Sequence, residues 1–130
     1  MIETTKEASQ ELALRGFRWM VLDGYGVVPP MAISTYAWDV SFMDVVVVHG
    51  DDDAISYRSK LDPYADPFMP RNVVWHHRGT FVEAVAELLE LSRPIEQEEP
   101  SVVGEPPNLL WIPDGKKRYT LEELRRFLGI

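Results

Sequence analysis

The stretch DVVVVHGDDDAISYR, residues 44–58, decides the fold of this chain. Four consecutive valines with no polar alternation are typical of a central strand that is covered on both faces. The turn-forming residues 49–53 follow, and residues 54–58 then supply a return strand. The sequence therefore predicts an antiparallel hairpin at the centre of a sheet.

Upstream of this hairpin, the sequence predicts one helix and three strands. Residues 4–15 begin with a capping threonine, carry a glutamate three positions later and end before a glycine, a pattern typical of a short helix. The β-favouring residues 17–22 predict a strand, and residues 27–28 predict a short one that ends at the two prolines after it. Residues 36–42 alternate large apolar side chains with small or polar ones, so they predict a strand with one aromatic, apolar face.

Downstream of the hairpin, short strands are predicted at residues 73–75 and 109–112. A helix at residues 80–91 and a last helix starting at residue 120 each begin with a threonine and a glutamate at capping-box spacing. Residues 93–107 are rich in proline and glutamate and lack periodicity, so they predict an acidic, solvated loop.

These elements predict a single α+β domain over residues 1–130, a normal length for one hydrophobic core. The expected architecture is a mostly antiparallel sheet of four to six strands. The main helix, at about residues 80–91, packs on one face, and short helices lie at the N- and C-termini. The acidic loop at residues 93–107 belongs to this domain.

The composition excludes several classes of partner. The formal net charge of −8 opposes binding to nucleic acid or to an anionic membrane surface, and it favours a basic or neutral protein partner. The chain has no cysteine, which removes disulfides, thiolate metal sites and cysteine nucleophiles together. No apolar stretch is long enough to span a bilayer, and the first residues lack the pattern of a secretory signal, so we expect a cytoplasmic protein.

Histidines and aspartates provide a candidate metal site. His49 and Asp51, together with His76 or His77, carry ligand types suited to Mg²⁺, Mn²⁺ or Zn²⁺, so a metal-dependent enzyme is one alternative function. However, adjacent strand residues such as His76 and His77 face opposite sides of a sheet. The three aspartates at positions 51–53 also suit a solvated hairpin tip. We therefore expect neither a metal nor another cofactor, and enzyme status is disfavoured.

Aromatic residues are the more suggestive feature, because the chain has four Trp, five Tyr and five Phe. Tyr25, Tyr64, Phe68 and Trp111 lie in or beside predicted loops. Exposed Tyr and Trp are enriched at interfaces, although the same side chains can also fold back to cover the sheet edges. The leading hypothesis is thus a non-catalytic protein that binds a protein partner, in an inhibitor, immunity-like or adaptor role.

Two further expectations concern the aromatic strand at residues 36–42. Its apolar face is broader than one helix can obviously cover, which favours a homodimer. Alternatively, the same face lines a pocket between the sheet and the helix at residues 80–91, as in a small-molecule-binding domain.

Overall fold

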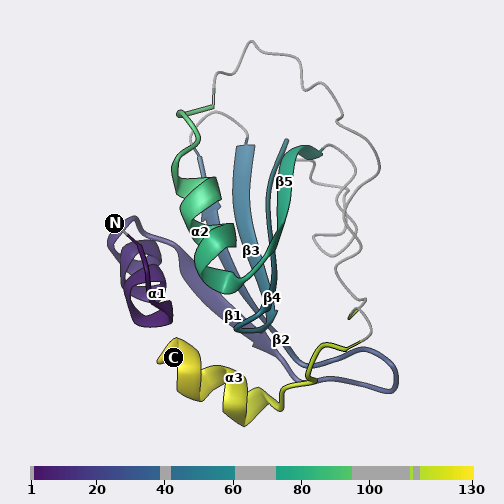
Figure 1. Cartoon of the computed structure of the whole chain (residues 1–130). Helices are drawn as coiled ribbons and strands as arrows, with labels where there is room; N and C mark the ends of the chain where they lie inside the picture. The colour runs from purple at the N-terminus through teal and green to yellow at the C-terminus, as the bar shows by residue number, and fades with distance from the viewer. Residues whose placement is uncertain (1, 39–41, 61–72, 95–111, 113–114) are drawn as a thin grey trace.

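The computed structural model of the chain describes residues 2–38, 42–60, 73–94, 112 and 115–130 (Figure 1). Its core is a five-stranded sheet in which the strands lie side by side in chain order, each antiparallel to its neighbours. The strands are β1 (Arg18–Leu22), β2 (Met31–Ala37), β3 (Phe42–Gly50), β4 (Asp53–Lys60) and β5 (Val73–Gly79). The hairpin predicted from residues 44–58 is therefore confirmed, with β3 in the middle of the sheet.

Three helices cover one face of this sheet, so the α+β prediction is confirmed (Figure 1). They are α1 (Thr5–Leu14), α2 (Phe81–Leu89) and α3 (Leu121–Leu128). Each begins after a threonine whose hydroxyl accepts a hydrogen bond from the backbone N–H three residues later, as the sequence spacing predicts. In α3 the glutamate side chain completes the capping box, and Gly129 ends the helix in a left-handed conformation (φ 72°).

Side chains on the two faces of the sheet form separate buried clusters. Val46 and Val48 of β3 belong to the cluster under the helices, which also contains Leu88 of α2. Val45 and Val47 point to the opposite face and are buried in a second cluster. Because successive strand residues alternate between faces, the valine run is buried on both sides, and its interpretation as a central strand is confirmed.

The predicted strand at residues 36–42 is wrong. β2 ends at Ala37 and β3 begins at Phe42, and the Trp38 N–H donates to the Phe42 carbonyl at 2.8 Å across the connection between them. The alternation of side chains continues by coincidence through a hairpin connection, so the period-2 pattern could not reveal the break.

The strand predicted at residues 27–28 is also wrong. Tyr25 and Val28 form an isolated bridge around Gly26, which has a φ of 60°, so this segment is a turn. The two prolines do not end a strand but directly precede β2. Because β2 starts after them, their missing N–H groups remove no hydrogen bond from the sheet.

Some predicted features fall largely or wholly outside the described residues. They are the acidic loop at residues 93–107 and the strand at residues 109–112. Within the described part of the chain, no helix has the length and apolar character needed to cross a membrane.

Candidate functional site

The register of the sheet brings charged and aromatic side chains together on its helix-covered face. Tyr36 of β2 pairs with Asp44 of β3, and Asp44 pairs with Arg58 of β4. Trp75 of β5 lies opposite Arg58 and completes this row. An acid and a base thus stand side by side on the two central strands, in the layer that α2 covers.

Asp44 and Arg58 form a buried ion pair. The Arg58 Nε donates to Asp44 Oδ1 at 2.7 Å, and the Arg58 Nη2 donates to Oδ2 at 3.0 Å, so the guanidinium binds the carboxylate with two parallel hydrogen bonds. Their side chains are only 8% and 4% exposed. The Trp38 indole N–H adds a third hydrogen bond to the carboxylate at 3.0 Å, and Arg58 Nη1 donates to the Ser92 carbonyl beyond α2 at 2.7 Å.

Three aromatic rings adjoin this ion pair. The ring centroids of Phe17 and Tyr36 are 5.5 Å apart, and Tyr36 meets Trp38 edge-to-face at 4.9 Å. The Arg58 guanidinium lies 5.6 Å from the Trp38 ring, a cation–π contact that further fixes the indole. The aromatic rings and the ion pair are therefore held in one continuous arrangement.

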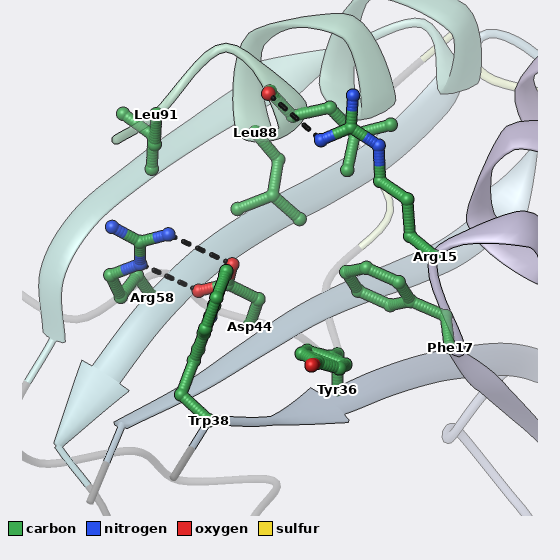
Figure 2. Close-up of a pocket in the computed structure, with 9 residues that line it drawn as sticks. Arg15, Phe17, Tyr36, Trp38, Asp44, Arg58, Leu88 and Leu91 are labelled. Carbon is green, nitrogen blue, oxygen red and sulfur yellow. Dashed lines mark hydrogen bonds and ion pairs between the residues drawn. The ribbon is translucent and has the colours of Figure 1, made fainter. Parts of the chain in front are cut away.

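A pocket of about 290 Å³ opens between this arrangement and the C-terminal end of α2 (Figure 2). It is lined by three aromatic residues, three leucines and three charged residues: Phe17, Tyr36, Trp38, Leu88, Leu89, Leu91, Arg15, Asp44 and Arg58. Its volume is close to the lower end of the range for small-molecule sites. The lining combines apolar walls with a few fixed polar groups, which is the usual composition of a ligand site.

Arg15 lies at the border of the pocket, between α1 and α2 (Figure 2). Its Nη1 donates to the Leu89 carbonyl at 3.3 Å, and its Nε donates to Glu11 at 3.1 Å. The Tyr36 hydroxyl, which belongs to the same lining, forms no hydrogen bond with any part of the protein that the structure describes. The pocket therefore keeps hydrogen-bonding capacity that the fold itself does not use.

Sequence reasoning missed this ion pair and its partners. No motif joins residues 14 positions apart in the chain, and only the strand register makes Asp44 and Arg58 neighbours. A signal was nevertheless present, since Asp44 directly precedes four valines and Arg58 ends the predicted return strand at residues 54–58, whose other members are uncharged. A charge in such a position needs a buried partner.

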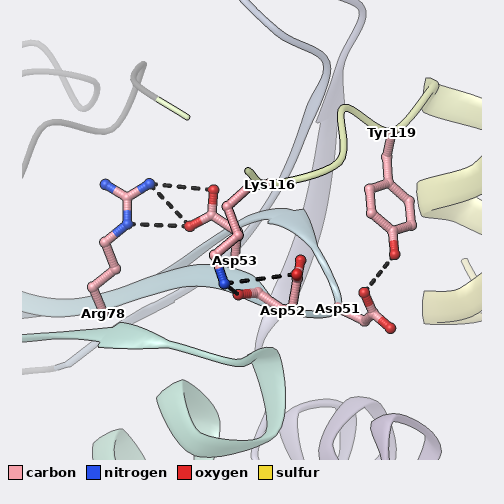
Figure 3. Close-up of polar contacts among 6 residues, drawn as sticks. All are labelled: Asp51, Asp52, Asp53, Arg78, Lys116 and Tyr119. Carbon is pink, nitrogen blue, oxygen red and sulfur yellow. Dashed lines mark hydrogen bonds and ion pairs between the residues drawn. The ribbon is translucent and has the colours of Figure 1, made fainter. Parts of the chain in front are cut away.

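The aspartates of the β3–β4 turn have a different environment (Figure 3). Asp51 and Asp52 are exposed, as predicted, but the prediction of a solvated tip is wrong for Asp53, which is buried at the start of β4. Its carboxylate accepts hydrogen bonds from Arg78 Nε at 3.1 Å and Nη2 at 2.9 Å. The sequence could not show this pairing because Arg78 belongs to the neighbouring strand β5.

The two exposed aspartates contact the segment before α3. Lys116 Nζ donates to the Asp52 backbone carbonyl at 3.1 Å and lies 3.6 Å from its carboxylate. Asp51 accepts a hydrogen bond from the Tyr119 hydroxyl, and this bond raises the pKa of Tyr119 to about 12. Lys116 therefore neutralises the turn in part, and Tyr119 joins the segment before α3 to the sheet.

The alternative metal site is not assembled. His76 and His77 lie on opposite faces of β5, since they pair with Tyr57 of one buried cluster and Ser56 of the other face. His49 is buried, whereas Asp51 is exposed on the turn. Among the residues that the structure describes, no three side chains of histidine, aspartate or glutamate come together as metal ligands.

Of the four aromatic residues predicted to bind a partner, the structure places one. Tyr25 is 88% exposed in the turn at residues 25–28 of the β1–β2 connection, and Val27 in the same turn is 85% exposed. Tyr64, Phe68 and Trp111 lie outside the described residues.

Comparison with known proteins does not add to this geometry. No protein-family model, no curated protein and no solved structure matches the chain.

Proposed function

We propose that this chain is a non-catalytic binding protein and that the pocket beside the Asp44–Arg58 ion pair is its ligand site. The observation that carries the proposal is an open pocket with aromatic walls next to polar groups that the fold has already fixed. Rigid walls and pre-oriented polar groups lower the ordering cost of binding. This function corresponds to the pocket between sheet and helix that the sequence offered as an alternative.

The hydrogen bonding of Asp44 favours binding over catalysis. A general base needs an available lone pair within reach of a substrate proton. Asp44 already accepts three hydrogen bonds from Arg58 and Trp38 and is almost fully buried. The arginine guanidinium has no acceptor atom and is not deprotonated in proteins, so it cannot serve as a general base. The pair is thus suited to shaping the pocket and orienting a ligand, and not to transferring a proton.

Blocking the pocket tests this function. Leu91→Trp should fill the space beside Leu88, whereas Leu14→Trp adds the same side chain at a position that is 82% exposed and outside the pocket lining. Three monocyclic probes of equal size would be titrated: 3-phenylpropionate, 3-phenylpropanamide and 3-phenylpropylamine. We expect at least one of them to shift the Trp38 indole N–H resonance in the native chain and in Leu14→Trp, but not in Leu91→Trp. Equal binding by both variants would contradict the proposal.

A second candidate function, binding of a protein partner, is favoured by a specific observation at the β1–β2 connection. Tyr25 and Val27 expose two large side chains on one turn, and tyrosine is enriched among the residues that anchor protein interfaces. The net charge of −8 favours a basic or neutral partner, as in an inhibitor, immunity-like or adaptor protein, and the cysteine-free sequence is compatible with a cytoplasmic location.

Loss of the two side chains tests this second candidate. The double substitution Tyr25→Ala and Val27→Ser should abolish partner capture from the native host, while Leu14→Ser, at another highly exposed position, should retain it. Capture that survives the double substitution would contradict this function.

The homodimer stays a prediction, but the structure weakens the observation that favoured it, the broad apolar face predicted for residues 36–42. Tyr36 and Trp38 line the pocket, and Phe42 is buried, so these three side chains do not form one exposed face. Sedimentation at high protein and salt concentration tests it, and a strictly monomeric species would contradict it.

A further inference from the structure

We infer that the pocket takes a small monocarboxylic acid whose apolar part is an aromatic ring or a compact alkyl group, with its carboxylate bound by Arg15. The inference rests on the proposed function and specifies the chemical class of the ligand. It follows from the charges that line the pocket, from the hydrogen bonds those charges already make, and from the apolar walls.

The lining of the pocket carries an excess positive charge. Three of its residues ionise: Arg15, Asp44 and Arg58. Asp44 and Arg58 neutralise each other in their buried pair, whereas the partner of Arg15, Glu11, lies outside the lining, so Arg15 supplies the remaining charge of the lining itself. The chain as a whole has a charge of −8, which makes this positive lining a local exception. An anionic ligand is therefore favoured here over a cationic one.

A cationic ligand would compete with existing contacts. The Asp44 carboxylate is the acidic group of the lining, and its oxygens are occupied by Arg58 and Trp38. Displacing Arg58 would leave a guanidinium without its partner in a site that is 8% exposed, which is costly. Arg58 in turn is held by Asp44 and by the Ser92 carbonyl. It therefore keeps the pocket wall in place, and a ligand would not bind to its guanidinium.

Arg15 is free to change partners. Its side chain is 49% exposed, and its ion pair with Glu11 is a single contact on the helix surface, a type that contributes little to stability. Its contact with the Leu89 carbonyl, at 3.3 Å, is long for a hydrogen bond. A ligand carboxylate that accepts two parallel hydrogen bonds from the planar guanidinium would bind Arg15 more strongly than either of these contacts does.

The walls select the rest of the ligand. Phe17, Tyr36 and Trp38 present ring faces and edges, and Leu88 and Leu91 face them from the α2 side (Figure 2). A volume of about 290 Å³ admits one ring with a short side chain, and flat rings pack well in offset or edge-to-face contact with aromatic walls.

The test compares isosteric probes that differ in charge. Affinities of 3-phenylpropionate, 3-phenylpropanamide and 3-phenylpropylamine would be measured from the Trp38 indole N–H shift at low salt. We expect the acid to bind about tenfold more tightly than the amide, and the amine to bind most weakly, as charge-assisted hydrogen bonds predict.

Arginine variants identify the anchor. Arg15→Gln should lower the affinity of the acid about tenfold, to the level of the amide, and leave the amide unchanged. Arg126→Gln is the matched control, because Arg126 also forms an exposed ion pair with a glutamate four residues away, but on α3 and outside this pocket. It should change neither affinity.

The outcomes separate the inference from the proposed function. If the amide or the amine binds as tightly as the acid, or if Arg126→Gln weakens the acid as much as Arg15→Gln, the ligand class is wrong while the pocket remains a binding site. If no probe shifts the Trp38 resonance, both fail.

A further titration asks where such a carboxylate comes from. A tripeptide with a C-terminal phenylalanine and a free carboxylate offers the same chemistry as the free acid. Tighter binding of the free acid than of the tripeptide supports a small-molecule ligand, and the reverse order overturns that part of the inference.

Discussion

The hairpin of β3 and β4 carries carboxylates at both ends, and the two ends differ in what surrounds the charge. At the turn, Asp53 is paired with Arg78, and Asp51 binds Tyr119 (Figure 3). The Tyr119 ring packs directly on the backbone of Gly50, where a Cβ would lie 2.6 Å from it, so no room remains between the ring and this backbone.

At the other end of the hairpin, Asp44 is paired with Arg58 just as fully, yet a pocket lies beside them (Figure 2). The comparison shows that clustered charge alone does not mark a site in this protein. The aspartate cluster attracts attention in the sequence, but its members are already paired with other parts of the fold. The distinguishing feature is the space left next to an ion pair that needs no further partner.

Removing the carboxylate at the pocket end should have the largest effect. Asp44→Ala leaves the Arg58 guanidinium without its partner in a buried position, which typically costs about 3–5 kcal/mol. Denaturant unfolding of the variant measures this loss. A change below about 1 kcal/mol would mean that Arg58 reaches solvent when Asp44 is absent, and that the pair is not a fixed wall of the pocket.

The next largest effect is expected from Leu88, which belongs to both the core and the pocket lining. Its side chain is fully buried between α2 and the sheet, so Leu88→Ala should cost about 2–5 kcal/mol through lost packing and an enlarged cavity. Calorimetric or denaturant unfolding would show it. A loss below about 0.5 kcal/mol would contradict the packing of α2 on the sheet.

At the turn end, the effect should be smaller and confined to one of the three aspartates. Asp53→Ala should cost about 1–3 kcal/mol, because a buried acceptor of charged hydrogen bonds is lost while Arg78 retains access to water. Asp52→Ala, at an exposed position, is the matched control and should change the free energy of unfolding by less than about 0.5 kcal/mol. Equal losses in both variants would remove the distinction between the buried and the exposed aspartates.

The smallest effect concerns the contact between Tyr119 and Asp51, and it depends on pH. The hydrogen bond raises the pKa of Tyr119 from 10.0 to about 12, so the folded state favours the protonated phenol. The stabilisation is therefore fully present below pH 10 and is lost as the pH rises from 10 to about 12. Tyr119→Phe should lack this dependence. Parallel unfolding curves of the two proteins across that pH range would contradict the contact.

The sequence predicted those parts of the fold that depend on local signals. The valine run, the three capping threonines and the glycine after α3 each act within a few residues, and all were interpreted correctly. The prediction of a strand at residues 36–42 was wrong because the alternating pattern is the same on both sides of a hairpin connection.

The candidate site could not be predicted from the sequence for a related reason. Arg15 ends α1, Tyr36 belongs to β2 and Leu91 follows α2, so only the folded chain brings them to one pocket. The sequence supplied the general idea of an aromatic-lined pocket under the helix at residues 80–91. It could not supply the ion pair, which depends on the register between β3 and β4.

The most direct test of the account is the response of the tryptophan indole resonances to 3-phenylpropionate. Trp38 lines the pocket and donates to Asp44, whereas Trp19 and Trp75 lie outside the pocket lining. The account predicts a saturable shift of the Trp38 indole N–H, with the Trp19 and Trp75 signals nearly unchanged. No shift at Trp38, or equal shifts of all three signals, would contradict a ligand site beside the Asp44–Arg58 pair.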